Sequence, residues 1–413
     1  MIEKFFGKLY LTAFQLRHQY NKPQDGHFLR VAYIGNYKSN CGISTYNEDL
    51  LNSVLDTAHK VNPDIGIHVF AEYGKAQSDD SEYSKSERLD GDPEWITRCW
   101  SRGEHPKLNL IKAIIAFWPD IVHISHEYGI YPQAYYFTSL VSVLKAYGIE
   151  VVSTMHSVYE HKDKVVTENA PDHLIVHTVE AKLCLMKKGI SESKITVIPH
   201  GSPISSDTIS LLPPDWNTWQ SEHTIFHAGF MFEYKGHLRM MNVISRLKGR
   251  YPDVHYIIQG SANPIHMAEH DAVYDKLVSL SKELGIEGNV TINRGFVSTD
   301  VLLSHIRTVK CCVLPYVTHP EHDVRATSGI ARLVLTTETP LVVSDVHLFD
   351  DVKDVADVAT SDDELYTAIS NVFEQKGLSE MQKKKRLDFL AATSWSTIAT
   401  KTLILYRRLL LKK

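Results

Sequence analysis

Residues 28–58 read FLRVAYIGNYKSNCGISTYNEDLLNSVLDTA, and this stretch decides the fold. Residues 28–35 form a nearly continuous apolar run, which is typical of a strand buried on both faces of a sheet. Residues 44–58 carry apolar side chains at helical spacing, and the loop between the two segments is polar. A strand, a polar loop and an amphipathic helix in this order predict the first unit of a parallel α/β sheet.

The same alternation continues to about residue 200. Further strands are expected at 67–70, 121–125, 151–155, 174–177 and 195–199. Helices are expected at 109–118, 134–146 and 180–188, and the polar stretch 77–103 receives no assignment. Apolar strands separated by helices indicate a parallel sheet that is covered on both faces.

A second alternating series starts at residue 224. Its strands are expected at 224–227, 254–259, 290–293, 311–314 and 341–344, and its helices at 238–251, 273–284, 300–309 and 328–336. Pro203, Pro213 and Pro214 lie among polar residues between the two series and indicate a linker. The sequence therefore predicts an α/β protein of two doubly wound, Rossmann-like parallel-sheet domains, residues 1–204 and 205–390, followed by a helical segment at 391–413.

The composition favours a folded protein that stays in the cytoplasm. The chain has 413 residues, 43% of them apolar and 23% charged, and its net charge of -5 gives no reason to expect a general polyanion binder. Five cysteines without a Cys-x-x-Cys pair favour a reducing compartment. No apolar run reaches the roughly 20 residues of a spanning helix. Residues 1–20 are amphipathic, which leaves open a helix packed on the first domain or a peripheral contact with the inner membrane face.

The loops that follow the strands are where open parallel sheets bind ligands. In the first domain, Gly42 and Ile43 precede a long helix, and a glycine there lets backbone amides approach an anion. His123 and His177 fall within strands, and we interpret them as structural. The polar and small residues that follow the later strands are His126, Glu127, His156, His200 and Gly201.

In the second domain, Gly229, Phe230 and Lys235 follow the first strand and lead into a helix. A lysine beside a helix N-terminus suits the binding of a diphosphate. Another helix N-terminus follows a segment suited to phosphate or ribose, or to simple capping of that helix. The residues of this segment are Arg325, Thr327, Ser328 and Gly329.

Metal and nucleophile sites are weakly indicated. Residues 90–92 match the Asp-x-Asp pattern used with metal-bound nucleotide sugars, but they lie in the unassigned polar stretch. Residues 319–323 include four residues that could ligate a metal, for which a solvated loop is the simpler interpretation. Neither a Gly-x-Ser-x-Gly motif nor a Walker loop occurs. We therefore expect no metal site.

From about residue 29 to residue 406 these segments resemble the retaining family 4 glycosyltransferases of the GT-B fold, and more narrowly the bacterial branch with a Cys-Gly-Ile-Ala type of first loop. The motifs that carry the resemblance are Cys41-Gly42-Ile43-Ser44, His126-Glu127-Tyr128-Gly129-Ile130, Met155-His156-Ser157, Val197-Ile198-Pro199-His200-Gly201, Gly229-Phe230 with Lys235-Gly236, Leu314-Pro315-Tyr316 and Thr327-Ser328-Gly329. The resemblance implies two Rossmann-like domains facing a central cleft, with the last helix crossing back to the first domain. It also implies metal-independent, retaining transfer of a hexose or related sugar from a nucleotide-sugar donor, such as a UDP- or GDP-sugar, to an acceptor hydroxyl. No other cofactor is implied.

The same resemblance implies roles for individual residues. His126, Glu127, His156 and Lys235 would be catalytic, with Lys235 neutralising the departing nucleotide diphosphate. Arg325 and Leu333 stand where the larger family has two glutamates, so the identity of the donor sugar is not carried over. The residues that would bind the donor are Gly42, Ile43, His200, Gly201, Gly229, Phe230, Lys235, Tyr316, Arg325, Thr327, Ser328 and Gly329.

Other functions stay open on the sequence. One is a protein that binds a nucleotide sugar without turning it over, and another is an epimerase or a sugar phosphorylase on the same scaffold. The expected acceptor is a glycan or a lipid-linked glycan, with a protein or a modified nucleic acid as the alternatives.

Overall fold

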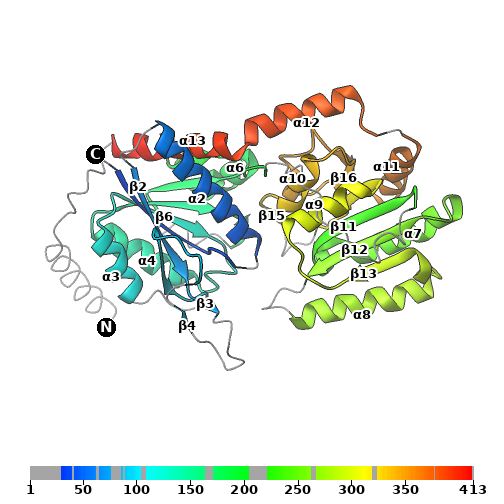
Figure 1. Ribbon diagram of the computed structural model, residues 1–413, viewed down its shortest axis with the longest axis horizontal. Helices are drawn as coiled ribbons and strands as arrows, with labels where there is room; N and C mark the ends of the chain where they lie inside the picture. Colours follow the sequence, from blue (N-terminus) through cyan, green and yellow to red (C-terminus); the bar gives the residue numbers. More distant parts are fainter. Residues whose placement is uncertain are drawn as a thin grey trace. The chain divides into compact units, whose positions relative to one another are not determined.

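The computed structural model describes residues 29–39, 41–61, 65–75, 85–86, 89–103, 108–162, 171–203, 221–261, 267–318, 323–375 and 377–411. The chain forms two compact units (Figure 1). The first unit contains the described residues up to Gly201 together with those from Trp395 onward, and the second runs from Ser202 to Ser394. The helix expected at 1–20, most of the expected linker and residues 319–322 lie outside the described residues.

The first unit is built on a seven-stranded parallel sheet with strand order β10-β9-β7-β6-β1-β2-β5. Its strands are β1 (Leu29–Gly35), β2 (Ile65–Glu72), β5 (Ile96–Trp100), β6 (Ile121–His126), β7 (Glu150–Met155), β9 (His173–Val176) and β10 (Ile195–Val197), with the short strands β3 (Gly74–Lys75), β4 (Lys85–Ser86) and β8 (Val158–Tyr159) outside this sheet. Its helices are α2 (Gly42–Val61), α3 (Leu108–Phe117), α4 (Ala134–Ala146), α6 (Val179–Lys187) and α13 (Trp395–Leu410).

Helices cover both faces of this sheet. Leu50 and Val54 of α2 and Ile398 of α13 share one apolar cluster with Val31 of β1. Ile114 of α3, Leu140 of α4 and the neighbouring strand residue Ala32 belong to a different cluster. Because side chains alternate along a strand, Val31 and Ala32 point to opposite faces, and each face needs its own helical cover.

The C-terminal helix α13 packs directly against the end of the first domain's chain. A Cβ added at Gly201 would lie 2.2 Å from ring carbons of Trp395, so only glycine fits between the backbone and the indole. At the other end of α13, the hydroxyl of Tyr406 lies 2.5 Å from Nδ1 of His123. The last helix thus belongs to the first unit, because its apolar face completes that unit's core.

The edge strand of the seven-stranded sheet, like the short strands β3, β4 and β8, was not foreseen. Residues 96–100, within the stretch left unassigned, form the edge strand β5 beside β2. The charged residues of this stretch made it look like a surface segment. The strand is buried nonetheless, because the Arg98 side chain is itself buried and bonded to Asp92. The Trp100 indole donates to the carbonyl oxygen of Phe70, which anchors the edge strand to the sheet.

The second unit has a six-stranded parallel sheet with strand order β13-β12-β11-β14-β16-β17. Its strands are β11 (Thr224–Phe230), β12 (His255–Ser261), β13 (Val290–Asn293), β14 (Cys311–Leu314), β16 (Leu341–Ser344) and β17 (Asp357–Ala359), and β15 (Val324–Arg325) lies outside this sheet. Its helices are α7 (His237–Arg250), α8 (Met267–Glu283), α9 (Thr299–Thr308), α10 (Gly329–Leu335), α11 (Asp362–Glu374) and α12 (Glu380–Thr393).

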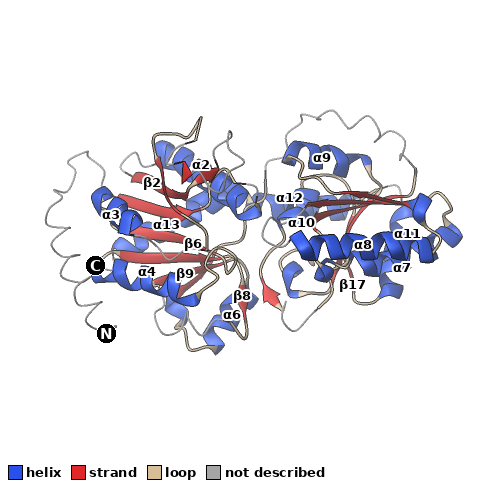
Figure 2. Cartoon of the chain, turned by 90° about the horizontal axis from the view of Figure 1, so that it is seen from below, coloured by secondary structure: helices blue, strands red, loops and turns tan. Residues whose placement is uncertain are grey.

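In Figure 2 the strands of the second unit lie between α9 on one side and α8 on the other. The apolar clusters agree, because Leu277 of α8 and Ile306 of α9 belong to different clusters. The predicted fold class, two Rossmann-like parallel-sheet domains, is confirmed. β17 and α11 had not been predicted. None of the described helices has the length and apolar content needed to cross a bilayer.

Candidate functional site

The first loop of unit 1 is open at its glycine. Gly42 begins α2, is exposed, and an added Cβ would meet nothing within 4 Å. Ile43 is half-buried and packs on the core beside α3 and α4. Glu48 holds the loop, since its Oε1 accepts hydrogen bonds from the Lys38 amide at 2.9 Å and the Ser44 hydroxyl at 2.8 Å. The start of α2 therefore presents backbone amides that a ligand can approach.

His126 ends β6 on the face covered by α4. Its ring is buried, with ring centroids 5.5 Å from Tyr131 and 4.4 Å from Phe137. Burial lowers the pKa of His126 to about 3, so the imidazole is neutral. Ser125, one residue earlier, points to the opposite face, where it meets Asn47 of α2. Strand alternation therefore separates His126 from the other two histidines expected at this edge.

The other two histidines, His156 and His200, both lie against the ring of Tyr46 of α2. The Tyr46 ring centroid is 4.7 Å from that of His156, 4.9 Å from that of His200 and 5.2 Å from that of Trp395. His177, interpreted from the sequence as structural, is the third histidine of this cluster, at 5.2 Å. The Nδ1 of His200 lies 2.7 Å from the carbonyl oxygen of Gly201. Gly201 itself faces Trp395, which explains why glycine stands there.

Both ring nitrogens of His156 have partners within the protein. Its Nε2 lies 2.8 Å from the Ser125 hydroxyl, and its Nδ1 lies 3.4 Å from Nε2 of His177. Burial is the main cause that holds the pKa of His156 well below its ordinary value, and the nearby His177 and His200 lower it further. The imidazole of His156 is therefore neutral and bonded through both ring nitrogens, and it fixes the start of the loop that follows β7.

Glu127 follows His126 and is half-buried. Its Oε2 accepts a hydrogen bond from the Ser157 hydroxyl at 2.6 Å, and its Oε1 accepts one from the Tyr128 amide at 2.8 Å. Ser157 comes directly after His156, so the loops after β6 and β7 meet at this carboxylate. The arrangement fixes one carboxylate at the carboxyl edge of the sheet.

A buried polar network behind this edge was missed by sequence reasoning. Asn47 accepts from Tyr33 at 2.6 Å and from Ser125 at 3.0 Å, and its amide donates to the Asn36 carbonyl. Asn36 in turn donates to Glu72, which pairs with Arg102 at 3.0 Å. The available signal was an asparagine directly after an apolar strand and another inside an amphipathic helix, since such residues are buried only with partners.

The Asp-x-Asp pattern at residues 90–92 has a structural explanation. Asp92 and Arg98 are each 1% exposed at the side chain and are joined by two hydrogen bonds of 2.7 and 2.9 Å. Burial opposes ionisation of Asp92, but hydrogen bonds from Arg98 and the Leu89 amide outweigh it and lower the pKa of Asp92. The carboxylate is thus committed to Arg98. In the second metal-ligating stretch, the described residue Asp323 pairs with Arg325 at 3.0 Å.

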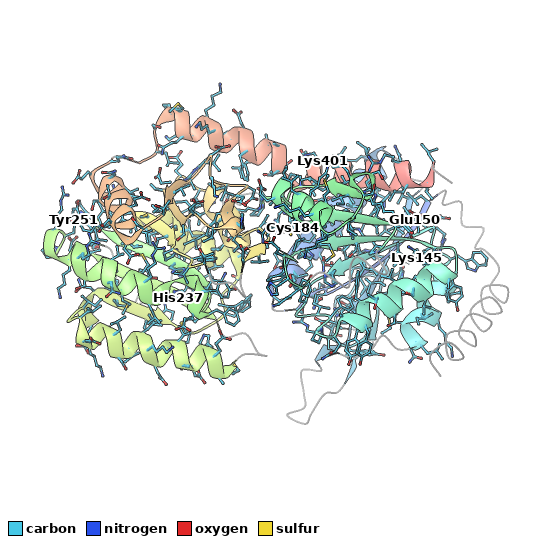
Figure 3. All side chains as sticks on the ribbon, turned by 180° about the vertical axis from the view of Figure 1, so that it is seen from behind. Lys145, Glu150, Cys184, His237, Tyr251 and Lys401 are labelled. Atoms are coloured by element: carbon cyan, nitrogen blue, oxygen red, sulfur yellow. The ribbon has the colours of Figure 1, made fainter. Side chains whose placement is uncertain are left out.

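In unit 2, Lys235 is held where β11 passes into α7. It ends a 3₁₀ turn, η3 (Glu233–Lys235), and Gly236 follows with φ of 77° before His237 starts α7 (labelled in Figure 3). A Cβ on Gly236 would lie 1.9 Å from the Pro315 carbonyl oxygen, so the close approach of the two loops requires glycine. The Lys235 ammonium donates to the Tyr316 hydroxyl at 2.8 Å. Burial lowers the pKa of Lys235, while Tyr234 acts in the opposite direction.

The remaining expected donor residues lie on nearby loops of unit 2. Gly229 has φ of 142° and open space where a Cβ would stand, and Phe230 is half-buried beside Phe232. Ser328 caps α10 by accepting from the Ala331 amide at 3.3 Å, so the capping interpretation is confirmed. Thr327 is half-buried and Gly329 is exposed.

The two units define the fold class. Each is a parallel sheet covered by helices on both faces, with its polar and glycine-containing loops at the carboxyl ends of the strands, and two such units in one chain are the GT-B arrangement. No protein-family model matches the sequence, and no curated protein matches it either.

Solved structures share this fold over nearly the whole chain. The glycosyltransferase from Rickettsia africae ESF-5 has a TM-score of 0.67 at 13% identity, over 92% of this chain and 98% of that chain. A trehalose-6-phosphate structure from E. coli, bound with UDP-2-fluoro glucose, has a TM-score of 0.67 at 13% identity, over 91% and 98%. The Anabaena protein HepE, in complex with UDP and glucose, has a TM-score of 0.64 at 11% identity, over 92% and 100%. At these identities the likeness is one of fold.

Proposed function

We propose that this chain is a retaining, metal-independent glycosyltransferase that moves a hexose or related sugar from a nucleotide-sugar donor to an acceptor hydroxyl. The observation that carries the proposal is the Lys235 ammonium, which is held at the carboxyl edge of the sheet of unit 2 and beside the N-terminus of α7. Ligands of open parallel sheets bind at that edge. Solved proteins with this fold hold UDP-2-fluoro glucose, or UDP and glucose, which supports a UDP-type donor here, with a GDP-sugar as the alternative.

Lys235 supplies the charge that the leaving group needs. As the bond between the anomeric carbon and the phosphate oxygen breaks, negative charge builds on the diphosphate, and a preorganised cation lowers the barrier to that step. Asp92 is already paired with Arg98, so we assign the neutralising role to Lys235 rather than to a metal held by the Asp-x-Asp segment. Gly229 leaves open space beside the same loop for the donor.

Glu127 is the residue we assign to the acceptor. Its carboxylate is fixed by Ser157 and by the Tyr128 amide, which suits it to orient an acceptor hydroxyl. The acceptor oxygen forms the new bond to the anomeric carbon on the face that the diphosphate leaves, and its proton passes to the departing phosphate oxygen. We assign His156 and His126 to supporting roles, because the first is bonded on both ring nitrogens and the second is packed among aromatic rings.

The class of acceptor follows from the family resemblance rather than from contacts. We propose a glycan or a lipid-linked glycan, with a protein or a modified nucleic acid as alternatives. A cytoplasmic location, peripheral at the inner membrane face, belongs to the same proposal. The amphipathic residues 1–20 motivate the membrane contact.

The first experiment is a thermal-shift screen with UDP, GDP, ADP and their sugar conjugates, without metal and then with Mg²⁺. One nucleotide should raise the melting temperature by several degrees without metal, since a ligand that binds only the folded state stabilises it. The shift should be lost in Lys235→Met and retained in Lys248→Met. Lys248 lies at the far end of α7, where its ammonium donates to the carbonyl oxygen of Gly285. Equal shifts in both variants would remove Lys235 from the donor site.

Product analysis then separates the enzyme classes. Incubation of the identified nucleotide sugar with glycan acceptors should give a glycoside and free nucleotide diphosphate. Release of nucleotide and free sugar without an acceptor would instead indicate the epimerase, and tight binding without turnover would indicate the binding protein.

A further inference from the structure

The side chain that holds Lys235 is Tyr316, two residues after β14. The ammonium nitrogen lies 2.8 Å from the Tyr316 hydroxyl oxygen and 4.0 Å from the centroid of the Tyr316 ring. The Tyr234 ring is farther away, with its centroid at 5.1 Å. One tyrosine thus supplies both a hydrogen-bond acceptor and a π face to the same cation.

Tyr316 is itself held rigidly. It is 2% exposed, and its ring lies 4.9 Å from that of Phe349 and stacks at 6.2 Å on that of His227. A side chain this deeply packed is available to Lys235 but not to bulk solvent.

The backbone segments that carry the two residues are also joined. The Val317 amide donates to the Tyr234 carbonyl at 2.9 Å. Gly236 lies so close to the Pro315 carbonyl that no Cβ fits between them. The positions of the lysine and the tyrosine are therefore coupled through the main chain as well as through their side chains.

The direction of the hydrogen bond follows from chemistry. An ammonium has only donors, so the Tyr316 oxygen accepts. Burial raises the pKa of Tyr316, and its hydrogen bond with Ser328 acts in the opposite direction. The phenol therefore stays protonated at neutral pH, and a hydrogen bond links it to Ser328, whose hydroxyl oxygen also caps α10.

We infer that Tyr316 is a positioning residue for Lys235: its hydroxyl and ring together hold the ammonium at the carboxyl edge of β11 and link it to the cap of α10. The part of this inference that concerns catalysis rests on the proposed donor role of Lys235. Tyr316 was expected from the sequence to bind the donor directly. Because Tyr316 is only 2% exposed, we assign it instead to the support of Lys235, for which we propose the contact with the donor.

The test compares Tyr316→Phe with Tyr256→Phe. Each change removes one buried tyrosine hydroxyl from unit 2, but Tyr256 bonds to Nδ1 of His227 at 2.8 Å instead of to Lys235. The primary measurement is the titration of Lys235 in the ligand-free protein, followed from pH 7 to 11 by competitive reductive methylation and peptide mass spectrometry, with Lys248 as the internal reference. The neighbouring titratable groups are Tyr234, which raises the pKa of Lys235 and is unchanged in both variants, and His227 and His237, which are both neutral throughout that pH range.

Removal of the hydroxyl takes an acceptor away from the charged form of Lys235, so its pKa should fall further, by about tenfold in proton affinity. Tyr256→Phe should leave that titration within twofold of wild type. UDP affinity, measured by calorimetry, should weaken about tenfold in Tyr316→Phe and stay within twofold in Tyr256→Phe.

An unchanged Lys235 titration in a folded Tyr316→Phe protein would overturn the inference. The same is true if Tyr256→Phe shifts the titration equally, because the tyrosine would then act only through general packing. If the titration shifts in Tyr316→Phe while neither this variant nor Lys235→Met alters UDP binding, the positioning stands and the proposed UDP-donor role fails.

Discussion

The buried ion pair between Asp92 and Arg98 allows a direct test of whether Asp92 stabilises unit 1 or binds a metal. Its carboxylate and the Arg98 guanidinium are each 1% exposed and joined by bonds of 2.7 and 2.9 Å, and Arg98 also donates to the carbonyls of Tyr37 and Glu72. Asp92→Asn keeps the shape and removes the charge. Arg98 then stays buried without a counter-charge, which is the costly way to break such a pair.

The expected loss of stability is about 3–5 kcal/mol, the usual cost of removing one partner of a buried ion pair. For a domain of 150–250 residues each kcal/mol corresponds to roughly 2–4 °C, so the melting temperature of unit 1 should fall by about 10 °C. The lowered pKa of Asp92 means that its stabilisation is present above about pH 4 and is lost as the pH falls through the folded pKa. The asparagine variant should therefore lack that part of the acid response.

The assay is urea unfolding followed by tryptophan fluorescence, because Trp95, Trp100 and Trp118 report on unit 1. Asp90→Asn is the matched control, since Asp90 is exposed in the same segment. Two results would refute the reasoning. One is equal stability of the two variants. The other is stabilisation of the wild type by Mg²⁺ that disappears in Asp92→Asn, which would identify this carboxylate as a metal ligand.

Three further results are expected. Gly201→Ala should destabilise unit 1 by about 1–3 kcal/mol, because its Cβ would lie 2.2 Å from the Trp395 ring; an unchanged urea midpoint would contradict this packing. Burial lowers the pKa of His123 and of His237 to about 3, against about 6.5 in an unfolded chain, so each should cost up to about 1.4 kcal/mol of stability per pH unit as the pH falls from 6.5 toward 3. Equal unfolding midpoints at pH 7.5 and pH 5 would count against neutral, buried histidines. Glu127→Gln should lower the transfer rate by about a hundredfold and leave nucleotide affinity within twofold of wild type, and a matching loss of affinity would move Glu127 to the donor subsite.

Much of the architecture could be predicted from periodicity. The apolar run at 28–35 and the helical spacing at 44–58 correspond to β1 and α2, and the second series starting at residue 224 corresponds to β11 and α7. Strand and helix periods are local, so they can be detected in one stretch of chain. β5 was not predicted because its charged residue, Arg98, is neutralised by Asp92, a pairing that the local pattern does not show.

The candidate site was only partly predictable. A strand end identifies the loop but not the direction of each side chain, and a shift of one residue sends a side chain to the other face of the sheet. His126 and Ser125 differ by that one step: the first packs under α4 and the second reaches Asn47 and His156. His177, which was interpreted from the sequence as structural, is buried in the cluster around Tyr46.

By itself the sequence determined the two parallel sheets and the loops in which polar and glycine residues gather at strand ends, because both depend on short-range patterns and backbone conformation. Only the tertiary structure decided which side chains face one another across those loops. Asp92 with Arg98, Glu127 with Ser157, and Lys235 with Tyr316 are such pairs. The physical reason is that a contact between distant residues depends on strand order, register and the close fit of loops, as at Gly236 and Pro315, and none of these is encoded in the spacing of residues along one segment.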